Sequence, residues 1–112
     1  MVLVVYSESL AERIRSVLAG KRGIRELKMF GGLCFLLNGN MLVGAWSVFL
    51  IARLGPEQSA AALREPHVRK MDITGKPLKS LVMVEPEGIE GDDQLRDWIE
   101  RAACFVGKLP VK

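Results

Sequence analysis

Residues 28–44 read KMFGGLCFLLNGNMLVG, and this stretch decides the fold. Asn38 and Gly39 lie between two apolar runs. They are typical of the two-residue turn of a β-hairpin, because both positions of that turn need a positive φ and these residues accept it cheaply. We therefore predict two antiparallel strands, with the sequences LCFLL and NMLVGAW.

Gly31 and Gly32 precede the hairpin. We interpret them as a bend or bulge between a strand at residues 25–30 and the hairpin, because a side chain would crowd a turn there. A backbone cradle for phosphate is the alternative. Beyond the hairpin, VFLIARL at residues 48–54 extends the run of strands.

Apolar residues between positions 10 and 18 recur at the spacing of one helix face, so these residues are predicted to form an amphipathic helix. Ser9 and Glu12 can form a capping box at its start, although Ser7 is an equally suitable cap. Gly20 supplies the residue that ends it.

Two further helices follow. Gly55 and Pro56 begin a short one, with proline at the first helical position, and it ends before Pro66. Asp92 or Asp93 caps a closing helix. Its apolar face comprises Leu95, Trp98, Ile99, Ala102, Val106 and Leu109.

Between these helices, VRKMDI and SLVMVEP read as two more strands, and TGKP forms the turn that separates them, with Gly75 and Pro77 as turn residues. The element order is therefore α-β-β-β-β-α-β-β-α. Consecutive strands joined by tight turns predict a mainly antiparallel sheet. We expect a two-layer α+β fold with the N- and C-terminal helices packed on the sheet, as one domain over residues 1–112.

The composition is that of an ordinary globular protein, with 49% hydrophobic and 26% charged residues. The apolar start MVLVVY is too short to span a bilayer and lacks the features of a signal peptide, so we expect a cytoplasmic protein without membrane contact. Cys34 and Cys104 belong to no Cys-x-x-Cys pair, and we expect both to be small buried apolar residues.

Charge is distributed unevenly along the chain, although the net charge is only +3. Residues 13–28 are mainly basic, whereas residues 85–100 are mainly acidic. The two segments either pair with each other or face different partners.

No residue pattern indicates catalysis or a cofactor. His67 is the sole histidine, and nothing at motif spacing marks it as a general base, so we expect a surface residue. No cluster of nitrogen and sulfur ligands predicts zinc. Gly75 and Lys76 do not complete a phosphate-binding loop, because Pro77 stands where serine or threonine is required. We therefore expect a protein without enzymatic activity, cofactor or metal.

Arg53 lies in an otherwise apolar strand, so it either points to solvent or meets an acidic partner. Contact with a small ligand near Arg53 and Lys79 is a further alternative. A basic face that binds nucleic acid through phosphate contacts is also possible on these residues. Its predicted members are Arg53, Arg69, Lys70, Lys76 and Lys79.

The segments KMFGGLCFLLNGNMLVG, ARLGPE, MDITGKPLK and LRDWIERA follow one another in an order that resembles the N-terminal domain of the TfoX/Sxy family. The resemblance covers about residues 7–110 and implies an α+β fold. Matching positions are Met29, Phe30, Gly31, Gly32, Asn38, Gly39, Gly44, Arg53, Gly55, Pro56, Gly75, Pro77, Lys79 and Trp98.

Named members of that family regulate bacterial competence for DNA uptake and also carry a C-terminal helical domain. The resemblance therefore implies a stand-alone regulatory or adaptor module of a bacterial protein family, which acts by contact with an unidentified protein. Direct binding of nucleic acid and binding of a small ligand remain alternatives. We expect a monomer or a homodimer, the latter if the apolar N-terminus adds an edge strand to a neighbour.

Overall fold

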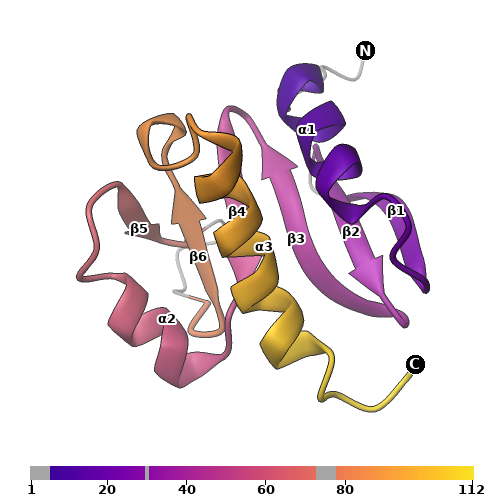
Figure 1. Cartoon of the computed structure of the whole chain (residues 1–112). Helices are drawn as coiled ribbons and strands as arrows, with labels where there is room; N and C mark the ends of the chain where they lie inside the picture. The colour runs from indigo at the N-terminus through magenta and orange to yellow at the C-terminus, as the bar shows by residue number, and fades with distance from the viewer. Residues whose placement is uncertain (1–5, 30, 73–77) are drawn as a thin grey trace.

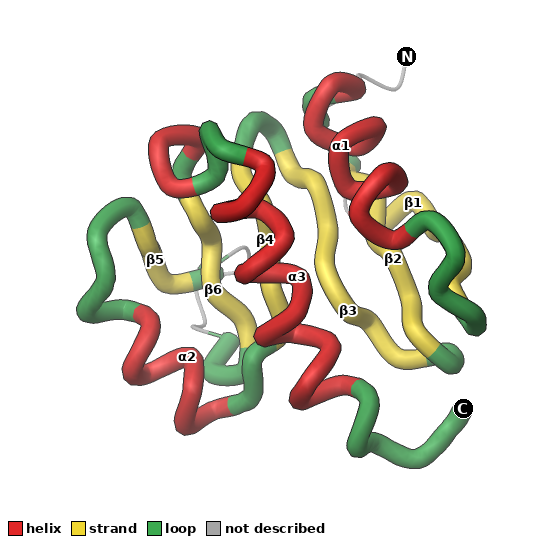
Figure 2. Tube along the Cα trace, viewed as in Figure 1, coloured by secondary structure: helices red, strands yellow, loops and turns green. Residues whose placement is uncertain are grey.

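The computed structural model describes residues 6–29, 31–72 and 78–112, which form one sheet with helices against it (Figures 1 and 2). In chain order the elements are α1 (Glu8–Leu18), β1 (Ile24–Met29), β2 (Gly32–Leu37), β3 (Asn40–Trp46), β4 (Phe49–Arg53), α2 (Pro56–Ala62), β5 (Val68–Lys70), β6 (Leu81–Val84), the 3-10 turn η1 (Pro86–Gly88) and α3 (Asp92–Val106).

The six strands are arranged in the order β1-β2-β3-β4-β6-β5, and every neighbouring pair is antiparallel. The predicted α+β class and element order are confirmed. The strand predicted for VRKMDI is shorter than expected, because β5 ends at Lys70. The predicted turn TGKP, with Gly75, Lys76 and Pro77, lies outside the described residues, as do residues 1–5 and the edge strand proposed for them.

The hairpin turn at Asn38 and Gly39 is confirmed. Asn38 has a φ of 53° and Gly39 a φ of 85°, as a type I′ turn requires. The two residues join β2 to β3, and Leu37 pairs with Asn40 directly beside the turn.

The interpretation of Gly31 and Gly32 is confirmed only in part. Gly31 has a φ of 78° and lies in the turn between β1 and β2. Gly32, by contrast, is the first residue of β2 and pairs with Met29. The irregularity in the β2–β3 pairing lies instead between Phe35 and Leu36, where the register shifts by a residue.

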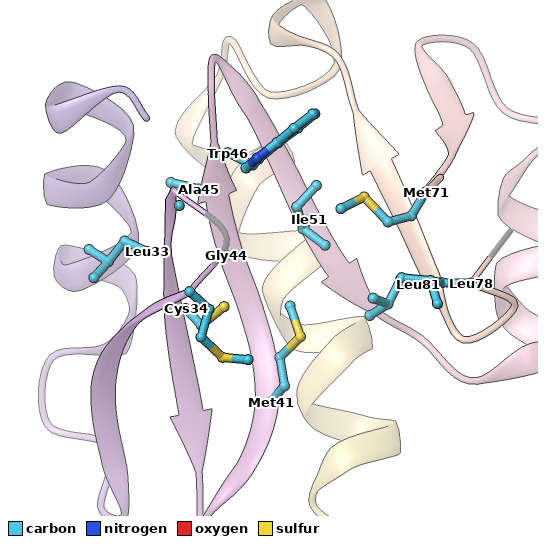
Figure 3. A pocket seen from close by; sticks show the side chains of 12 residues that line it. Leu33, Cys34, Met41, Gly44, Ala45, Trp46, Ile51, Met71, Leu78 and Leu81 are labelled. Atoms are coloured by element: carbon cyan, nitrogen blue, oxygen red, sulfur yellow. The ribbon is translucent and has the colours of Figure 1, made fainter. Parts of the chain in front are cut away.

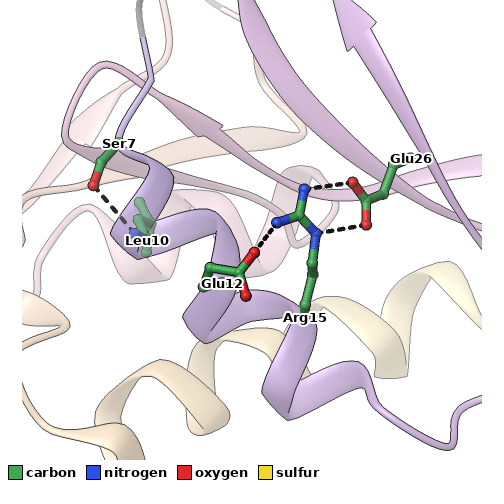
Figure 4. A network of polar contacts seen from close by, with 5 residues as sticks. All are labelled: Ser7, Leu10, Glu12, Arg15 and Glu26. Atoms are coloured by element: carbon green, nitrogen blue, oxygen red, sulfur yellow. Dashed lines mark hydrogen bonds and ion pairs between the residues drawn. The ribbon is translucent and has the colours of Figure 1, made fainter.

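The predicted helices are present, but only the structure identifies the N-cap residues of α1 and α3. The hydroxyl of Ser7 accepts a hydrogen bond from the Leu10 amide at 3.1 Å, so Ser7 rather than Ser9 caps α1 (Figure 4). Gly91 is the N-cap of α3, and its amide donates to Gln94 Oε1 at 2.8 Å. The expected cap at Asp92 or Asp93 is wrong. Both acids lie in the first turn, where their negative charges interact favourably with the positive end of the helix dipole.

The main core lies between the sheet and the pair α1 and α3, which cross the same face of it (Figure 1). Ile14 of α1 and Leu95 of α3 are completely buried there, together with Leu42 and Leu50 from the central strands. The short helix α2 packs beside β6. Within the described residues, no helix is both long enough and apolar enough to cross a membrane.

Candidate binding face of the sheet

Strand alternation sends every second side chain away from α1 and α3. On that side, the register places Cys34 opposite Gly44, Gly44 opposite Ile51, and Ile51 opposite Met83. These four residues form one row across the middle of the sheet. We call this side the open face.

The open face is apolar. Ile51, Met71 and Met83 form a second buried cluster, separate from the core beneath the helices. Leu27 and Leu78 are more exposed, at 48% and 41%. The central residues of this face are thus buried, whereas apolar side chains around them are exposed; flexible methionine side chains adapt to different contact shapes, and exposed apolar side chains can pack against a partner. The partly buried residues packed against the cluster are Met41, Trp46, Phe49 and Leu81.

A small hollow of about 80 Å³ opens within this face. Trp46 and Ile51 line one side, and Met71 extends toward Ile51 from the segment after β5 (Figure 3). Cys34 and Met41 line the part nearer β2. The lining is almost entirely apolar, so the hollow suits an aliphatic or aromatic group.

Gly44 forms part of the lining because it has no side chain. A Cβ at Gly44 would lie 3.1 Å from the Leu33 carbonyl oxygen and 3.7 Å from both Cys34 Sγ and Met41 Cε. A side chain there would therefore extend into the hollow. Burial raises the pKa of the Cys34 thiol, which keeps this wall neutral.

A basic end adjoins the apolar hollow. A second, open hollow is lined by Arg53, Lys79 and Ser80 together with apolar residues. Arg53 is the last residue of β4, and its guanidinium carbon lies 5.9 Å from the centre of the Phe105 ring of α3, so this cation lies at the end of the strand, between the open face and the helix layer. The structure thus brings Arg53 and Lys79 together, as the small-ligand alternative requires.

The other predicted basic residues do not join them in one patch. Arg69 lies over the Phe49 ring at 5.5 Å and forms an ion pair with Glu85 at 2.5 Å. Lys70 pairs in register with Val82, whose side chain is in the helix-side core, so Lys70 points away from the open face. Lys70 and Lys79 instead line a hollow beside α2, and Lys76 lies outside the described residues. Nucleic-acid binding through these five residues stays a prediction.

The basic and acidic segments of the sequence meet in part. Arg13 donates to the Ile89 and Glu90 carbonyl oxygens at 2.6 and 3.2 Å, and its Nη2 lies 3.4 Å from Asp92 Oδ1. Arg15 forms an ion pair with Glu26 within the basic segment itself. The guanidinium groups of Arg13 and Arg15 are therefore paired within the chain, whereas the sequence alone did not show whether they could bind a partner.

His67 is exposed, as predicted, and lies beside Glu85 and Glu87. Their possible ligand atoms lie within 4.8 Å of one another. Glu85 is already neutralised by Arg69, so a metal cation there would compete with a guanidinium. The two cysteines differ: Cys34 is buried, as predicted, but Cys104 is exposed. That part of the prediction is wrong, because Cys104 lies on α3 outside the buried stripe.

Comparison with protein families identifies the chain. The family model of the TfoX N-terminal domain matches residues 16–105. The chain belongs to the TfoX N-terminal domain family. Comparison with curated proteins and with solved structures found no match. The match includes all of the sheet, nearly all of α3 and only the last residues of α1, so the open face is built entirely within the TfoX N-terminal domain.

Several family-pattern residues of this TfoX N-terminal domain have structural roles. Asn38, Gly39 and Gly55 adopt positive φ, and Trp98 is buried in the main core. Gly44 and Arg53 instead line the two open-face hollows, Gly44 the apolar one and Arg53 the basic one.

Sequence reasoning missed the residues that build the open face. A signal for them was present, because LCFLL, MLVGAW and VFLIA are apolar almost without interruption. A strand with one solvated face is expected to alternate between apolar and polar residues, whereas a continuous apolar run indicates burial on both faces. The missed residues are Cys34, Met41, Trp46, Ile51, Met71 and Met83.

Proposed function

We propose that this chain is a non-enzymatic regulatory or adaptor module that acts by contact with another protein. Its membership of the TfoX N-terminal domain family supports a module of the kind found in competence regulators. The apolar open face is the observation that carries the contact part of the proposal.

Exposed apolar side chains on this face would lose contact with water in a complex. Leu27 and Met29 belong to β1, an edge strand of the sheet, and are 48% and 37% exposed. Trp46 and Phe49 are partly buried on the same face. Burial of apolar surface is the main driving force of protein association, and aromatic and methionine side chains are enriched at interfaces.

Charges on the open face favour a different protein over a second copy. Strand alternation places Arg25 and Arg53 on this face, and Lys79 lies beside Arg53. The carboxylate of Glu85 is neutralised by Arg69. A partner with an apolar centre and an acidic margin matches this arrangement, whereas a second copy would present another basic margin.

The test compares the same substitution at two exposed positions, one on the open face and one outside it. Leu27→Asp introduces a negative charge into the open face, and Val111→Asp introduces the same charge at a 74% exposed residue in the C-terminal tail. Wild-type and variant proteins are immobilised and exposed to native bacterial lysate, and retained proteins are identified by mass spectrometry. Urea unfolding of each variant confirms that both remain folded.

We expect a specific protein that wild type and Val111→Asp retain and that Leu27→Asp releases. The isolated partner should then bind the wild type with a defined stoichiometry in solution. Retention that is equal for all three proteins would show that contact does not use the open face. Repeated failure to retain any protein would contradict the proposal itself.

A further inference from the structure

The two hollows of the open face adjoin each other, and we call the pair the trough. The apolar hollow and the basic hollow share three lining residues, Met41, Leu78 and Leu81. One end of the trough is therefore bounded by Trp46, and the other by Arg53. An apolar end and a cationic end, joined through apolar residues, match a ligand that is itself divided in this way.

We propose that this trough binds a small amphipathic anion: a short unbranched aliphatic chain that ends in a carboxylate. The chain occupies the hollow beneath Trp46, and the carboxylate lies between Arg53 and Lys79. This binding requires no partner protein, so it stands or fails separately from the protein contact proposed above.

The volume of the apolar hollow limits the length of the ligand's aliphatic chain. Its volume is about 80 Å³. A cavity needs roughly 10–15 Å³ to hold a single water molecule, so this hollow is large enough for a short aliphatic group. Methylene groups beyond the hollow would stay in water and would not gain the burial energy of about 0.8 kcal/mol for each.

The charge of the head group follows from the basic end. Arg53 and Lys79 provide two cations, and Ser80 adds a hydroxyl that lines the same hollow. A carboxylate accepts hydrogen bonds from a guanidinium in the forked geometry that arginine favours. It carries a single charge, so its desolvation next to Met41 and Leu81 costs less than that of a phosphate dianion.

The walls of the apolar end are neutral. Cys34 and Met41 provide sulfur atoms, and Ile51 and Leu81 provide hydrocarbon. Burial raises the pKa of the Cys34 thiol, so no thiolate meets the chain. A charged head group in this half of the trough would be desolvated without a partner, and the ligand therefore binds in one orientation.

Methionine methyl NMR tests the proposal on the full chain. The chain contains five methionines, and Met29, Met41 and Met71 line the apolar hollow. Signals of ¹³C-methyl-labelled methionine are assigned with single Met→Leu variants. The protein is then titrated with octanoate and, in parallel, with related compounds. Octanol has the same aliphatic chain without the charge, acetate has the carboxylate without the long chain, and octyl phosphate replaces the carboxylate by a phosphate.

We expect saturable shifts of the Met29, Met41 and Met71 methyl signals with octanoate, weaker binding of octanol, and no shift with acetate. Lys79→Gln and Arg53→Gln should each weaken octanoate binding about two- to fivefold, which is the effect of a partly exposed ion pair, and leave octanol binding unchanged. Lys21→Gln, which removes an exposed lysine before β1, should bind octanoate like the wild type.

Other results would overturn the proposal. Equal shifts of all five methionine signals would indicate non-specific contact with the aliphatic chain. Equal affinity for octanol and octanoate, or octanoate binding unchanged by Lys79→Gln and Arg53→Gln, would remove the role of the basic end. Tighter binding of octyl phosphate than of octanoate would overturn the choice of a carboxylate.

Discussion

Arg15 of α1 donates two parallel hydrogen bonds to Glu26 of β1. Arg15 Nε lies 2.8 Å from Glu26 Oε2, and Arg15 Nη2 lies 2.8 Å from Glu26 Oε1 (Figure 4). Glu12, one turn before Arg15 on the same helix, also pairs with this guanidinium. This forked ion pair therefore connects α1 to β1, an edge strand of the sheet that follows the helix directly in the sequence.

Glu26→Gln should lower the free energy of unfolding by up to about 1 kcal/mol, since the pair is partly exposed and screened by solvent. The loss should shrink in 0.5 M salt. Urea unfolding at low and high salt measures both effects. Glu100→Gln, which neutralises an exposed carboxylate on α3, serves as the control and should change stability much less. An equal loss in both variants would contradict a specific role for the Arg15 pair.

The same pair predicts a pH dependence. The hydrogen bonds from Arg15 lower the pKa of Glu26 in the folded protein. The contribution of Glu26 to stability is therefore fully present above its unfolded pKa of about 4.3, and it is lost as the pH falls through the lower folded value. The stability difference between wild type and Glu26→Gln should thus be constant near neutral pH and decrease below about pH 4.3. A difference that grows on acidification would contradict this sign.

Gly55→Ala should be strongly destabilising. Gly55 has φ 85° and ψ 162°, a region that essentially only glycine occupies, and a Cβ there would lie 2.6 Å from Phe105 Cδ1. Gly20 also has a φ of 85°, but a Cβ there would meet nothing within 4 Å. We expect Gly20→Ala to cost about 1–2 kcal/mol from backbone strain, and Gly55→Ala to cost more. Chemical denaturation of both variants measures the additional cost at Gly55, and equal losses would contradict both the Phe105 contact and the special backbone conformation as its cause.

Ser59→Ala should stabilise the protein. Within the described residues, the buried hydroxyl of Ser59 has no hydrogen-bond partner. Its removal relieves a desolvation cost of roughly 1–3 kcal/mol, partly offset by a small cavity, and alanine also favours the helix by up to about 0.5 kcal/mol. Ser16→Ala, at an exposed position in α1, measures the helix-propensity effect alone. Thermal unfolding should show the larger increase for Ser59→Ala.

The two cysteines should differ sharply in reactivity. Cys104 is exposed on α3, whereas Cys34 is buried in the sheet and burial raises its thiol pKa. A thiol reagent at pH 7.5 should therefore label one site rapidly in the wild type, and Cys104→Ser should abolish the rapid phase while Cys34→Ser preserves it. Rapid labelling that persists in Cys104→Ser would show that the apolar hollow opens readily.

Local sequence determined the order of the elements and the positions of their main turns. Asn38 and Gly39 form the predicted hairpin turn, and Pro56 begins α2. Both could be predicted because the φ preference of a turn residue and the missing amide hydrogen of proline depend on that residue alone. The helix at residues 92–106 followed from the spacing of its apolar face. Its cap is Gly91, one residue before the predicted Asp92, because the spacing of apolar residues does not fix the terminal residue of a helix.

Tertiary structure alone decided which surfaces remain available. Arg13 meets carbonyl groups of residues 89 and 90, and Arg69 meets Glu85, so both basic side chains are satisfied by distant parts of the chain. The open face arises in the same way, because Cys34, Ile51 and Met71 come from separate strands and loops. Turn and helix signals extend over a few residues, whereas the neighbours of a side chain on a sheet depend on strand order and register, which only the folded chain establishes.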